Sequence, residues 1–575
     1  MTKRIVAFVR ELRRRRVFRV VAAYALVSWG LVQLGDTVFP ALNLPDWTLT
    51  LVIVLLAFGF PIALLLAWAF DLGPSGIVRA DAPEPLETAE ASGGSGASAV
   101  SGHPELDSDA LAVLPFANLS ADRENEYFSD GISEDLLVRL CSVGRLRVIS
   151  RASSWQYKEQ NVGARRIAAE LGVAFLVGGS VRRDASNVRI SAHLTDARSD
   201  RQVWSETYDR RLEDIFAIQS DVASRIAAAL HRELGGSGAA DAGPAAGAGS
   251  PDLEAYDEYL KGRFHWNRRT PTDLERSVEH FRASIASDPD FARAHAALAE
   301  AHVTQAVYGL RPPEQVMPAA RHAAEEALRH ESDQPSALSA LASVRAIFDW
   351  HWKEAEEAFR SAIAAHPQYP TAPQWYATNV LVPLGRFAEA DVQLDRARAV
   401  DPKSTAVDAS RGVVAFMRRD FGGALEHFGQ LVQRHPDFTF GHYYRGLSAL
   451  ELDRTDEAME SLRLAAATGG WSAEITAALG CACAAAGRTD EANEILASLV
   501  RPDSGRYVSP VRVGQLRAAL GDASGAVDEL ERAASTRASD LVWIDVSPSF
   551  DSIRAEPRFR AVRDRVFGSD ASTGG

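Results

Sequence analysis

The sequence predicts a multidomain chain with an N-terminal two-helix transmembrane hairpin, a mixed α/β domain and an all-α superhelical solenoid. Three observations carry this prediction. Two apolar stretches lie near the N-terminus, short apolar runs alternate with turn residues in the middle, and small residues recur every 34 residues in the C-terminal half. A chain of 575 residues, 46% hydrophobic and 24% charged, is long enough for several globular domains.

The first 70 residues predict a membrane anchor. A basic head, residues 1–19, carries eight lysines and arginines against one glutamate. Residues 20–34 are nearly all apolar, and residues 47–70 contain no charged residue. At about 1.5 Å per residue the second stretch can span a hydrocarbon layer of roughly 30 Å. We therefore expect a transmembrane hairpin over residues 20–70, with an amphipathic surface helix or an uncleaved signal sequence as the alternatives for its first segment.

The distribution of charge predicts the orientation of this anchor. The basic run Arg13–Arg16 belongs on the cytoplasmic side, and the connecting loop contains Asp36 and Asp46 but no lysine or arginine. Two crossings would return the chain to the cytoplasm, and the small number of cysteines suits a reducing compartment. We expect a bacterial inner (cytoplasmic) membrane protein whose soluble domains face the cytoplasm. If the first segment does not span, the soluble part is external instead.

A mixed α/β domain is expected over residues 106–234, between two linkers. Residues 71–105 and 235–251 are rich in small residues and predict flexible tethers. Apolar runs and turn residues predict the following elements in order: strands at 111–116 and 146–149, a helix at 163–171, strands at 174–181, 188–194 and 202–208, and a closing amphipathic helix at 216–234. A further helix is expected after Asp130, the residue that we interpret as its N-cap.

Three motifs of this domain resemble a known family. Leu-Ala-Val-Leu-Pro-Phe-Ala-Asn at 111–118, Tyr-Phe-Ser-Asp-Gly-Ile-Ser-Glu at 127–134 and Leu-Val-Gly-Gly-Ser-Val at 176–181 are similar to the N-terminal domain of TolB-like and FlgO-like proteins. The resemblance covers nearly all of residues 108–232. It implies a fold and no particular chemistry.

The C-terminal half repeats itself with a constant interval of 34 residues. The glycine row comprises Gly412, Gly446, Gly480 and Gly514, and an alanine row follows twelve residues behind it at Ala424, Ala458, Ala492 and Ala526. A large apolar residue comes four positions after each alanine. This pattern resembles the tetratricopeptide repeat (TPR), in which two helices cross closely at the small residues. We expect residues 252–568 to form a TPR array of about eight units with a C-terminal cap, followed by a tail, residues 569–575.

The resemblance also implies a binding surface. Positions 2, 5, 9 and 12 of each unit face a concave groove in TPR arrays, and aromatic residues there suit the anchoring of a peptide. The candidate partner-binding residues are Trp375, Asn379, Phe416, Phe440 and Tyr443. Stacking between neighbouring units is the alternative explanation for these residues, and the sequence does not decide between the two.

No catalytic, cofactor-binding or metal-binding residue is predicted. Residues 177–180 lack the lysine and hydroxyl residue of a phosphate-binding loop, and Asp130, Glu134 and Asp135 are interpreted as ordinary acids at a helix start. The predicted function is therefore a membrane-anchored scaffold, not an enzyme, that recruits a protein or peptide partner through its TPR array and binds no nucleic acid. Some proteins that join a TolB-like domain to TPR units carry a nucleotide cyclase, so the alternative is a regulatory subunit of a cyclase-type signalling enzyme acting in trans.

Overall fold

The computed structural model describes residues 70–73, 76–79 and 106–568, the last range with gaps at 121, 142–145, 159, 161, 185–186, 235–250, 471 and 502–505. The chain divides into two compact units, residues 1–101 and 102–575. In the first unit the described residues form an antiparallel hairpin of β1 (Phe70–Gly73) and β2 (Gly76–Arg79), in which Phe70 pairs with Arg79. Part of the segment expected to be a flexible tether is therefore a hairpin.

The predicted fold class is wrong in its N-terminal part. No helix of the described residues is both long and apolar enough to cross a bilayer. The predicted transmembrane hairpin, residues 20–70, lies outside the described residues except for Phe70, which begins a strand instead of ending a helix. A run of uncharged residues satisfies the length of a membrane span without determining how that run folds. The head and the tail also lie outside the described residues, and the inner-membrane location stays a prediction.

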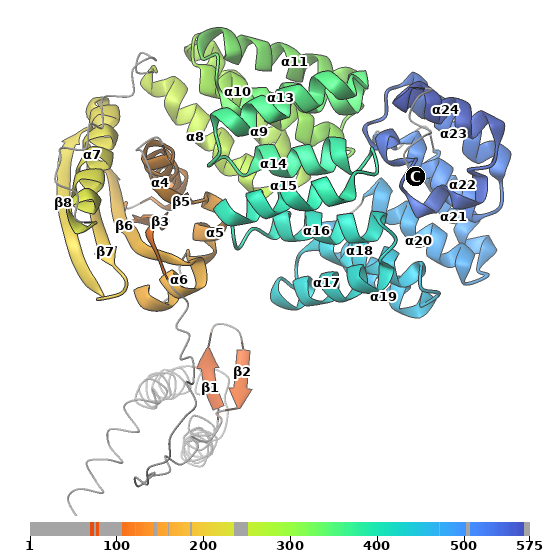
Figure 1. Cartoon of the computed structure of the whole chain (residues 1–575), viewed down its shortest axis with the longest axis horizontal. Coiled ribbons are helices and arrows are strands. Elements are labelled where there is room, and N and C mark those ends of the chain that lie inside the picture. Colours follow the sequence, from red (N-terminus) through yellow and green to blue (C-terminus); the bar gives the residue numbers. More distant parts are fainter. Residues whose placement is uncertain are drawn as a thin grey trace, which may run out of the picture. The chain divides into compact units, whose positions relative to one another are not determined.

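The second unit begins with a six-stranded mixed sheet (Figure 1). Its strands are β3 (Asp107–Val113), β4 (Ala117–Asn118), β5 (Arg147–Ile149), β6 (Val173–Asp184), β7 (Asn187–Asp196) and β8 (Arg201–Arg211). The order is β5-β3-β6-β7-β8, and the short strand β4 also pairs with β6. Strand β3 runs parallel to β5 and β6, whereas β6, β7 and β8 form an antiparallel meander.

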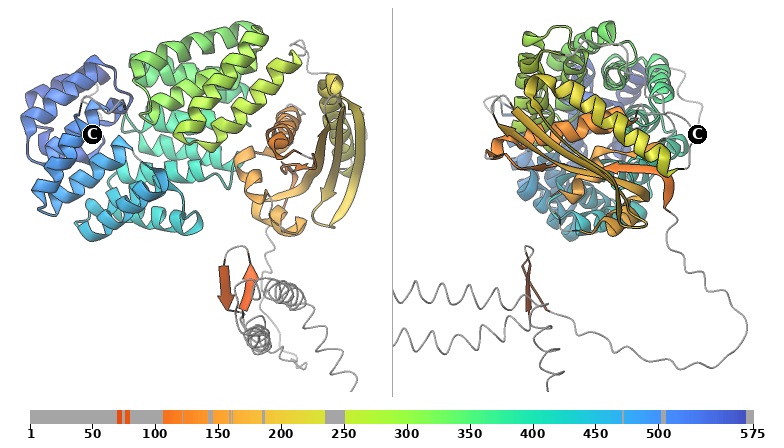
Figure 2. Two further views of the ribbon diagram at one scale, coloured as in Figure 1. Left: turned by 180° about the vertical axis from the view of Figure 1, so that it is seen from behind. Right: turned by 90° about the vertical axis from the view of Figure 1, so that its left-hand side faces the viewer.

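Helices cover the two faces of this sheet because its central strands are apolar on both sides. Leu111 and Val113 of β3 pack with α4 (Glu126–Cys141) and α7 (Ile215–Glu233). Ala110 and Ala112 point to the other face and pack with α6 (Ala164–Leu171). Figure 2 shows α7, drawn in yellow, lying along the outer strands. A sheet that is buried on both faces reads as a continuous apolar run, which is the pattern of the last four residues of β3, Ala110–Val113.

Eight antiparallel helix pairs follow, in the manner of a TPR-type solenoid (Figure 1). The pairs are α8 (Leu253–Arg268) with α9 (Pro271–Ser287), α10 (Ala292–Val307) with α11 (Pro313–His330), α12 (Pro335–Val344) with α13 (Trp352–Ala365), α14 (Thr371–Tyr376) with α15 (Phe387–Val400), α16 (Thr405–Met417) with α17 (Phe421–Arg434), α18 (Thr439–Leu450) with α19 (Thr455–Gly469), α20 (Ala473–Ala485) with α21 (Thr489–Leu499), and α22 (Pro510–Ala519) with α23 (Ala523–Ser535). Helix α24 (Pro557–Phe567) ends the array.

The small residues lie where the two helices of a pair cross, as the 34-residue period predicts. A Cβ atom on Gly446 would lie 2.7 Å from Cγ of Leu462 and 3.2 Å from the carbonyl oxygen of Ala458. Gly412 meets the ring of Phe428 in the same way, at 2.5 Å from Cζ. The large apolar residue four positions after the alanine therefore fills the space that the glycine leaves. Gly480 differs, because its nearest neighbour is Leu516 of the following pair, at 2.7 Å.

The C-terminal end of the array contacts the third helix pair. The indole Nε1 of Trp352 donates a hydrogen bond of 2.8 Å to the carbonyl of Val566, and its ring stacks on Phe567 at 5.4 Å. Arg537 lies 3.8 Å from the ring centroid of Trp350 and donates to the carbonyl of Phe348 at 3.3 Å. The Trp-His-Trp sequence at 350–352 is therefore a packing site.

Candidate functional site

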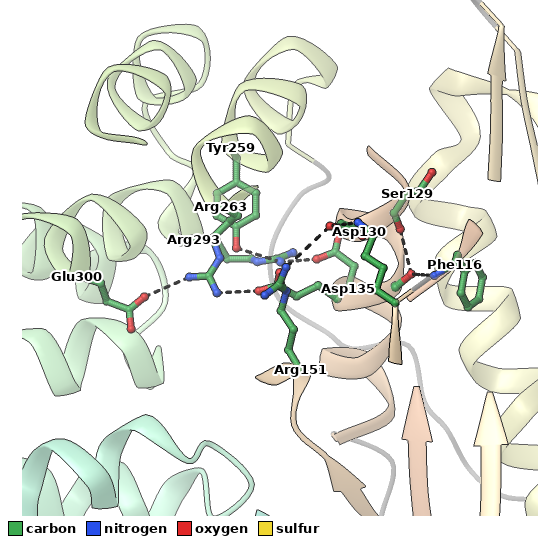
Figure 3. Close-up of polar contacts among 12 residues, drawn as sticks. Phe116, Ser129, Asp130, Asp135, Arg151, Tyr259, Arg263, Arg293 and Glu300 are labelled. Carbon is green, nitrogen blue, oxygen red and sulfur yellow. Dashed lines mark hydrogen bonds and ion pairs between the residues drawn. The ribbon is translucent and has the colours of Figure 1, made fainter. Parts of the chain in front are cut away.

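The inner-face positions of the first two repeat units form a polar cluster at the junction with the α/β segment. Counting from Ala255, with Gly262 at position 8, positions 2, 5, 9 and 12 of the first unit hold Tyr256, Tyr259, Arg263 and Trp266. Counting from Ala292, the first residue of α10, positions 2 and 9 of the second unit hold Arg293 and Glu300. Figure 3 shows that several of these side chains point toward α4 of the α/β segment.

Asp135 of α4 is held by three side chains although only 3% of it is exposed. Arg293 forms an ion pair with one carboxylate oxygen, and the hydroxyl of Tyr256 donates to the other. Gln219 of α7 donates to the same oxygen at 3.2 Å. A buried carboxylate is tolerated only when it is paired and hydrogen-bonded, and Asp135 meets both conditions across the junction.

Glu134, the neighbour of Asp135, forms a second connection. Arg263 Nη2 lies 2.7 Å from its Oε1, and Arg151 Nε lies 3.2 Å from its Oε2. Burial raises the pKa of Glu134, but the positive charges of Arg263 and Arg151 outweigh burial and hold the pKa below its ordinary value. Arg263 also reaches Glu300, whose Oε2 lies 3.2 Å from Nη1. The network therefore runs without a break from α5 (Arg151–Ser154) through α4 to α10.

Close backbone packing supports these ion pairs. A Cβ atom on Gly131 would lie 2.5 Å from Cδ2 of Leu260, so α4 approaches α8 at a residue that has no side chain. Apolar residues of the α/β segment and of helices α8, α9 and α10 belong to one continuous core. The inner face of the first two units is consequently occupied by a helix of the same chain.

A second contact joins the α/β segment to the turn between α15 and α16. Ser153 Oγ donates to Asp401 at 2.5 Å and accepts a hydrogen bond of 2.7 Å from the backbone of Lys403. The Nζ of Lys403 lies 3.1 Å from Glu170 of α6. The α/β segment is therefore attached to the array at its first two pairs and after its fourth pair, and Gln368, in the turn between α13 and α14, donates a further hydrogen bond of 3.4 Å to the carbonyl of Leu146.

The structure places two of the predicted partner-binding residues between the third and fourth helix pairs. Trp375, on α14, is partly buried and packs against the core of the array. Asn379 is 9% exposed and donates a hydrogen bond of 3.1 Å to Ser343 Oγ of α12. These contacts agree with the alternative explanation, in which the residues pack between neighbouring repeat units. A role of Trp375 and Asn379 in partner binding stays a prediction.

The other three predicted residues form an aromatic group around Tyr444. Phe416 and Tyr443 are 2% and 4% exposed, and their ring centroids lie 5.6 Å and 5.1 Å from that of Tyr444. Phe440 lies 4.7 Å from Tyr444 but is 38% exposed. Of the five predicted residues, Phe440 has the largest exposed fraction.

Sequence reasoning missed the acidic residues of α4. Asp130 is predicted as a helix N-cap and Glu134 and Asp135 as acids at the helix start, but α4 begins at Glu126, so Asp130 is an interior helix residue that is 5% exposed. Lys158 Nζ lies 2.8 Å from both carboxylate oxygens of Asp130. The sequence signal that could have identified this site is a pair of arginines at groove-facing positions. Arg263 stands at position 9 of the first repeat unit, and Arg293 stands at position 2 of the second.

The geometry of the cluster suits binding of an acidic helix. Its carboxylates are each bound to arginine, lysine or tyrosine. Among the residues that the structure describes, no group of three or more His, Cys, Asp or Glu side chains could hold a metal ion. What the cluster does in this chain is hold the acidic side of α4.

Comparison with known proteins gives one partial relative. No family model matches the chain. A protein of Rhizobium meliloti (strain 1021) named "Putative adenylate cyclase 3" is 39% identical over 191 residues, which are 33% of this chain and 32% of that protein. The chain thus spans about a third of the length of the curated relative it matches.

Several solved structures of repeat proteins resemble the chain weakly. A tetratricopeptide repeat protein from Parabacteroides merdae ATCC 43184 has a TM-score of 0.29 and 13% identity, covering 52% of this chain and 99% of that chain. Yeast Tom70 has a TM-score of 0.36 and 14% identity, covering 56% and 65%. YrrB, described as a TPR protein with an unusual peptide-binding site, has a TM-score of 0.23 and 20% identity, covering 34% and 96%. The TPR-type solenoid of this chain rests on its own helix pairs and their 34-residue register.

Proposed function

We propose that this protein is an interaction scaffold that recruits a protein partner through its TPR-type array. One observation carries the proposal: the inner-face positions of the first two units already hold a helix, α4, through Glu134 and Asp135. An array that binds a helix of its own chain has the geometry to bind a segment of another protein at units that α4 does not cover.

The aromatic group around Tyr444 is the best candidate for that second binding place. Phe440 is 38% exposed and is supported from beneath by the ring of Tyr444, so its position is held before a partner arrives. A rigid aromatic side chain loses little conformational freedom on binding, and such residues dominate the binding free energy of many interfaces.

The test compares two exposed apolar residues of the same helix pair. Phe440→Ala on α18 removes the proposed anchor, and Leu464→Ala on α19, where the leucine is 41% exposed, is the matched control. Full-length chains capture proteins from an extract of the source cells, and the amount of each captured protein is quantified. We expect one or more proteins to be lost from Phe440→Ala and retained by Leu464→Ala while both variants keep the wild-type melting temperature. Equal capture by the two variants would contradict the assignment.

A second candidate function is regulation of a cyclase-type signalling enzyme in trans. The partial identity to the Rhizobium meliloti protein named as an adenylate cyclase favours it, and the resemblance of residues 106–234 to TolB-like domains is compatible with it. Material captured by the full chain would then convert a nucleoside triphosphate to its cyclic monophosphate, and adding free chain would change that rate. Captured material without cyclase activity leaves the general scaffold as the better proposal.

A further inference from the structure

Arg269, at the end of α8, makes contacts that the junction with α4 does not require. It is the C-cap of α8 and has a left-handed backbone with φ of 58°. Its guanidinium carbon lies 3.5 Å from the ring centroid of Trp266, and its Nη1 donates to Thr304 Oγ1 at 3.2 Å. Arg263 approaches the same indole ring, at 4.8 Å. Two guanidinium groups therefore meet at one tryptophan.

The positive charge of Arg269 is not balanced by a paired acid. Arg263 pairs with Glu134 and Glu300, but among the described residues no carboxylate lies within 4.0 Å of Arg269. Burial and the nearby charge of Arg263 hold the pKa of Arg269 below its ordinary value. The charge of Glu300 counteracts this lowering of the Arg269 pKa, but its carboxylate is already paired with Arg263.

Hydrogen-bond donors also remain without an acceptor at this point. Trp266 is 6% exposed, and its Nε1 has no partner among the described residues. The same holds for Nε of Arg263 and Nδ2 of Asn267. These three residues stand at positions i, i+3 and i+4, so they lie on one face of α8. A buried N–H group without an acceptor is unfavourable, and several together favour binding of a group with many acceptor atoms.

We propose that Arg263, Trp266, Asn267 and Arg269, here called the Arg269 cluster, bind a small oxyanion of the phosphate type. Phosphate offers several acceptor oxygens and a negative charge, and the guanidinium fork matches its geometry. Arg269 is only partly buried. The anion is inorganic phosphate or the phosphate group of a small metabolite, since both present the same oxygens.

A purely structural role for Arg269 makes a different prediction. An arginine at a helix C-terminus stabilises the negative end of the helix dipole, and stacking on tryptophan adds to this. Replacement of Arg269 would then lower the melting temperature in any buffer. If instead Arg269 binds an anion, its replacement removes an unbalanced charge. The variant should then melt below the wild type only when phosphate is present.

The test uses the full chain and measures thermal melting and tryptophan fluorescence during a phosphate titration at constant ionic strength in KCl. We expect saturable stabilisation by phosphate, about tenfold weaker binding in Arg269→Gln, and about two- to tenfold weaker binding in Trp266→Phe, which lacks the indole donor. Arg268→Gln is the matched control, because that side chain is 57% exposed and lies 3.6 Å from Asp273. It should bind phosphate as the wild type does.

Three outcomes distinguish the alternatives. Without phosphate, Arg269→Gln should melt at or above the wild-type temperature, and phosphate should no longer raise it. Adenosine monophosphate in place of phosphate identifies the source: equal or tighter binding indicates a phosphorylated metabolite, and no binding indicates the free ion. An effect of phosphate no larger than that of KCl on the wild type, or equal destabilisation of Arg269→Gln with and without phosphate, would overturn the proposal.

Discussion

Arg293 and Asp135 form an ion pair although 158 positions separate them in the chain. The arginine stands at an inner-face position of the second repeat unit, and the aspartate lies on α4 of the α/β segment. The two parts belong to one compact unit, and the pair is one of the contacts that join them. It also gives α4 a defined orientation on the array, since Glu134, the next residue, meets Arg263 of the first unit.

Removing Arg293 should destabilise the chain strongly. Asp135 is 3% exposed, so Arg293→Ala leaves a buried carboxylate with hydrogen bonds from Tyr256 and Gln219 but no cation. Such a change typically costs about 3–5 kcal/mol. Arg558→Ala is the control, because that arginine is 49% exposed and its ion pairs should contribute about 0–1 kcal/mol. Urea unfolding of both variants measures the difference, and equal midpoints would refute the importance of the pair.

Glu451 should make the stability of the array depend on pH. Burial, followed by the nearby charge of Asp551, raises the pKa of Glu451 from 4.5 to about 7. The folded state then holds the proton more tightly than the unfolded state, so this residue's contribution to stability falls as the pH rises from about 5 to 7. The Glu451→Gln variant has no carboxyl group at this position, so it does not lose this stability as the pH rises. We expect its stability relative to the wild type to be about 1–2 kcal/mol higher at pH 8 than at pH 5, allowing for partial solvent exposure. Melting curves at the two pH values provide the measurement, and a pH-independent difference would contradict it.

Two helical glycines should respond with opposite signs to the same substitution. At Gly446 an added methyl group meets Leu462 at 2.7 Å, and overpacking of this kind costs about 1–3 kcal/mol. Gly429, inside α17, has no atom within 4 Å of the added methyl group, so Gly429→Ala should stabilise by roughly 0.5–1 kcal/mol through the lower entropy of the unfolded chain. Thermal melting of the two alanine variants tests this, and a shift in the same direction for both would show that packing does not decide the outcome.

The repeat array could be predicted because its signal is periodic and local. Gly446, Ala458 and Leu462 recur in register with their counterparts, and the structure brings these three residues together at one helix crossing. The strands of the sheet could be predicted for a similar reason, since apolar runs such as Leu111–Val113 lie in strands. In the array the residues that make the contact are close in sequence, and the spacing reports the contact. In the sheet the signal lies within each strand, whereas Val148 and Phe175, the residues that pair with Leu111, are distant in the chain.

The candidate site could not be predicted in this way. The ion pair of Glu134 with Arg263 joins residues 129 positions apart, and adjacent acids near a helix start have an ordinary explanation without any partner. Burial of Phe416 and Tyr443 depends on how closely neighbouring units approach, which the period does not determine. The apolar content of residues 47–70 indicated a membrane helix, but composition does not specify the backbone, and Phe70 is in a strand.

The contact of Trp352 with Val566 and Phe567 changes how this array should fold and unfold. In an open solenoid each repeat touches only its neighbours, so stability is close to a sum of local terms and the ends fray independently. Here residues 214 positions apart are bonded, which adds a long loop-closure step to folding. Removing the last helix should then destabilise the third helix pair as well as the eighth. A substitution at the C-terminal end of the array should therefore lower the stability of a pair that is distant in the sequence.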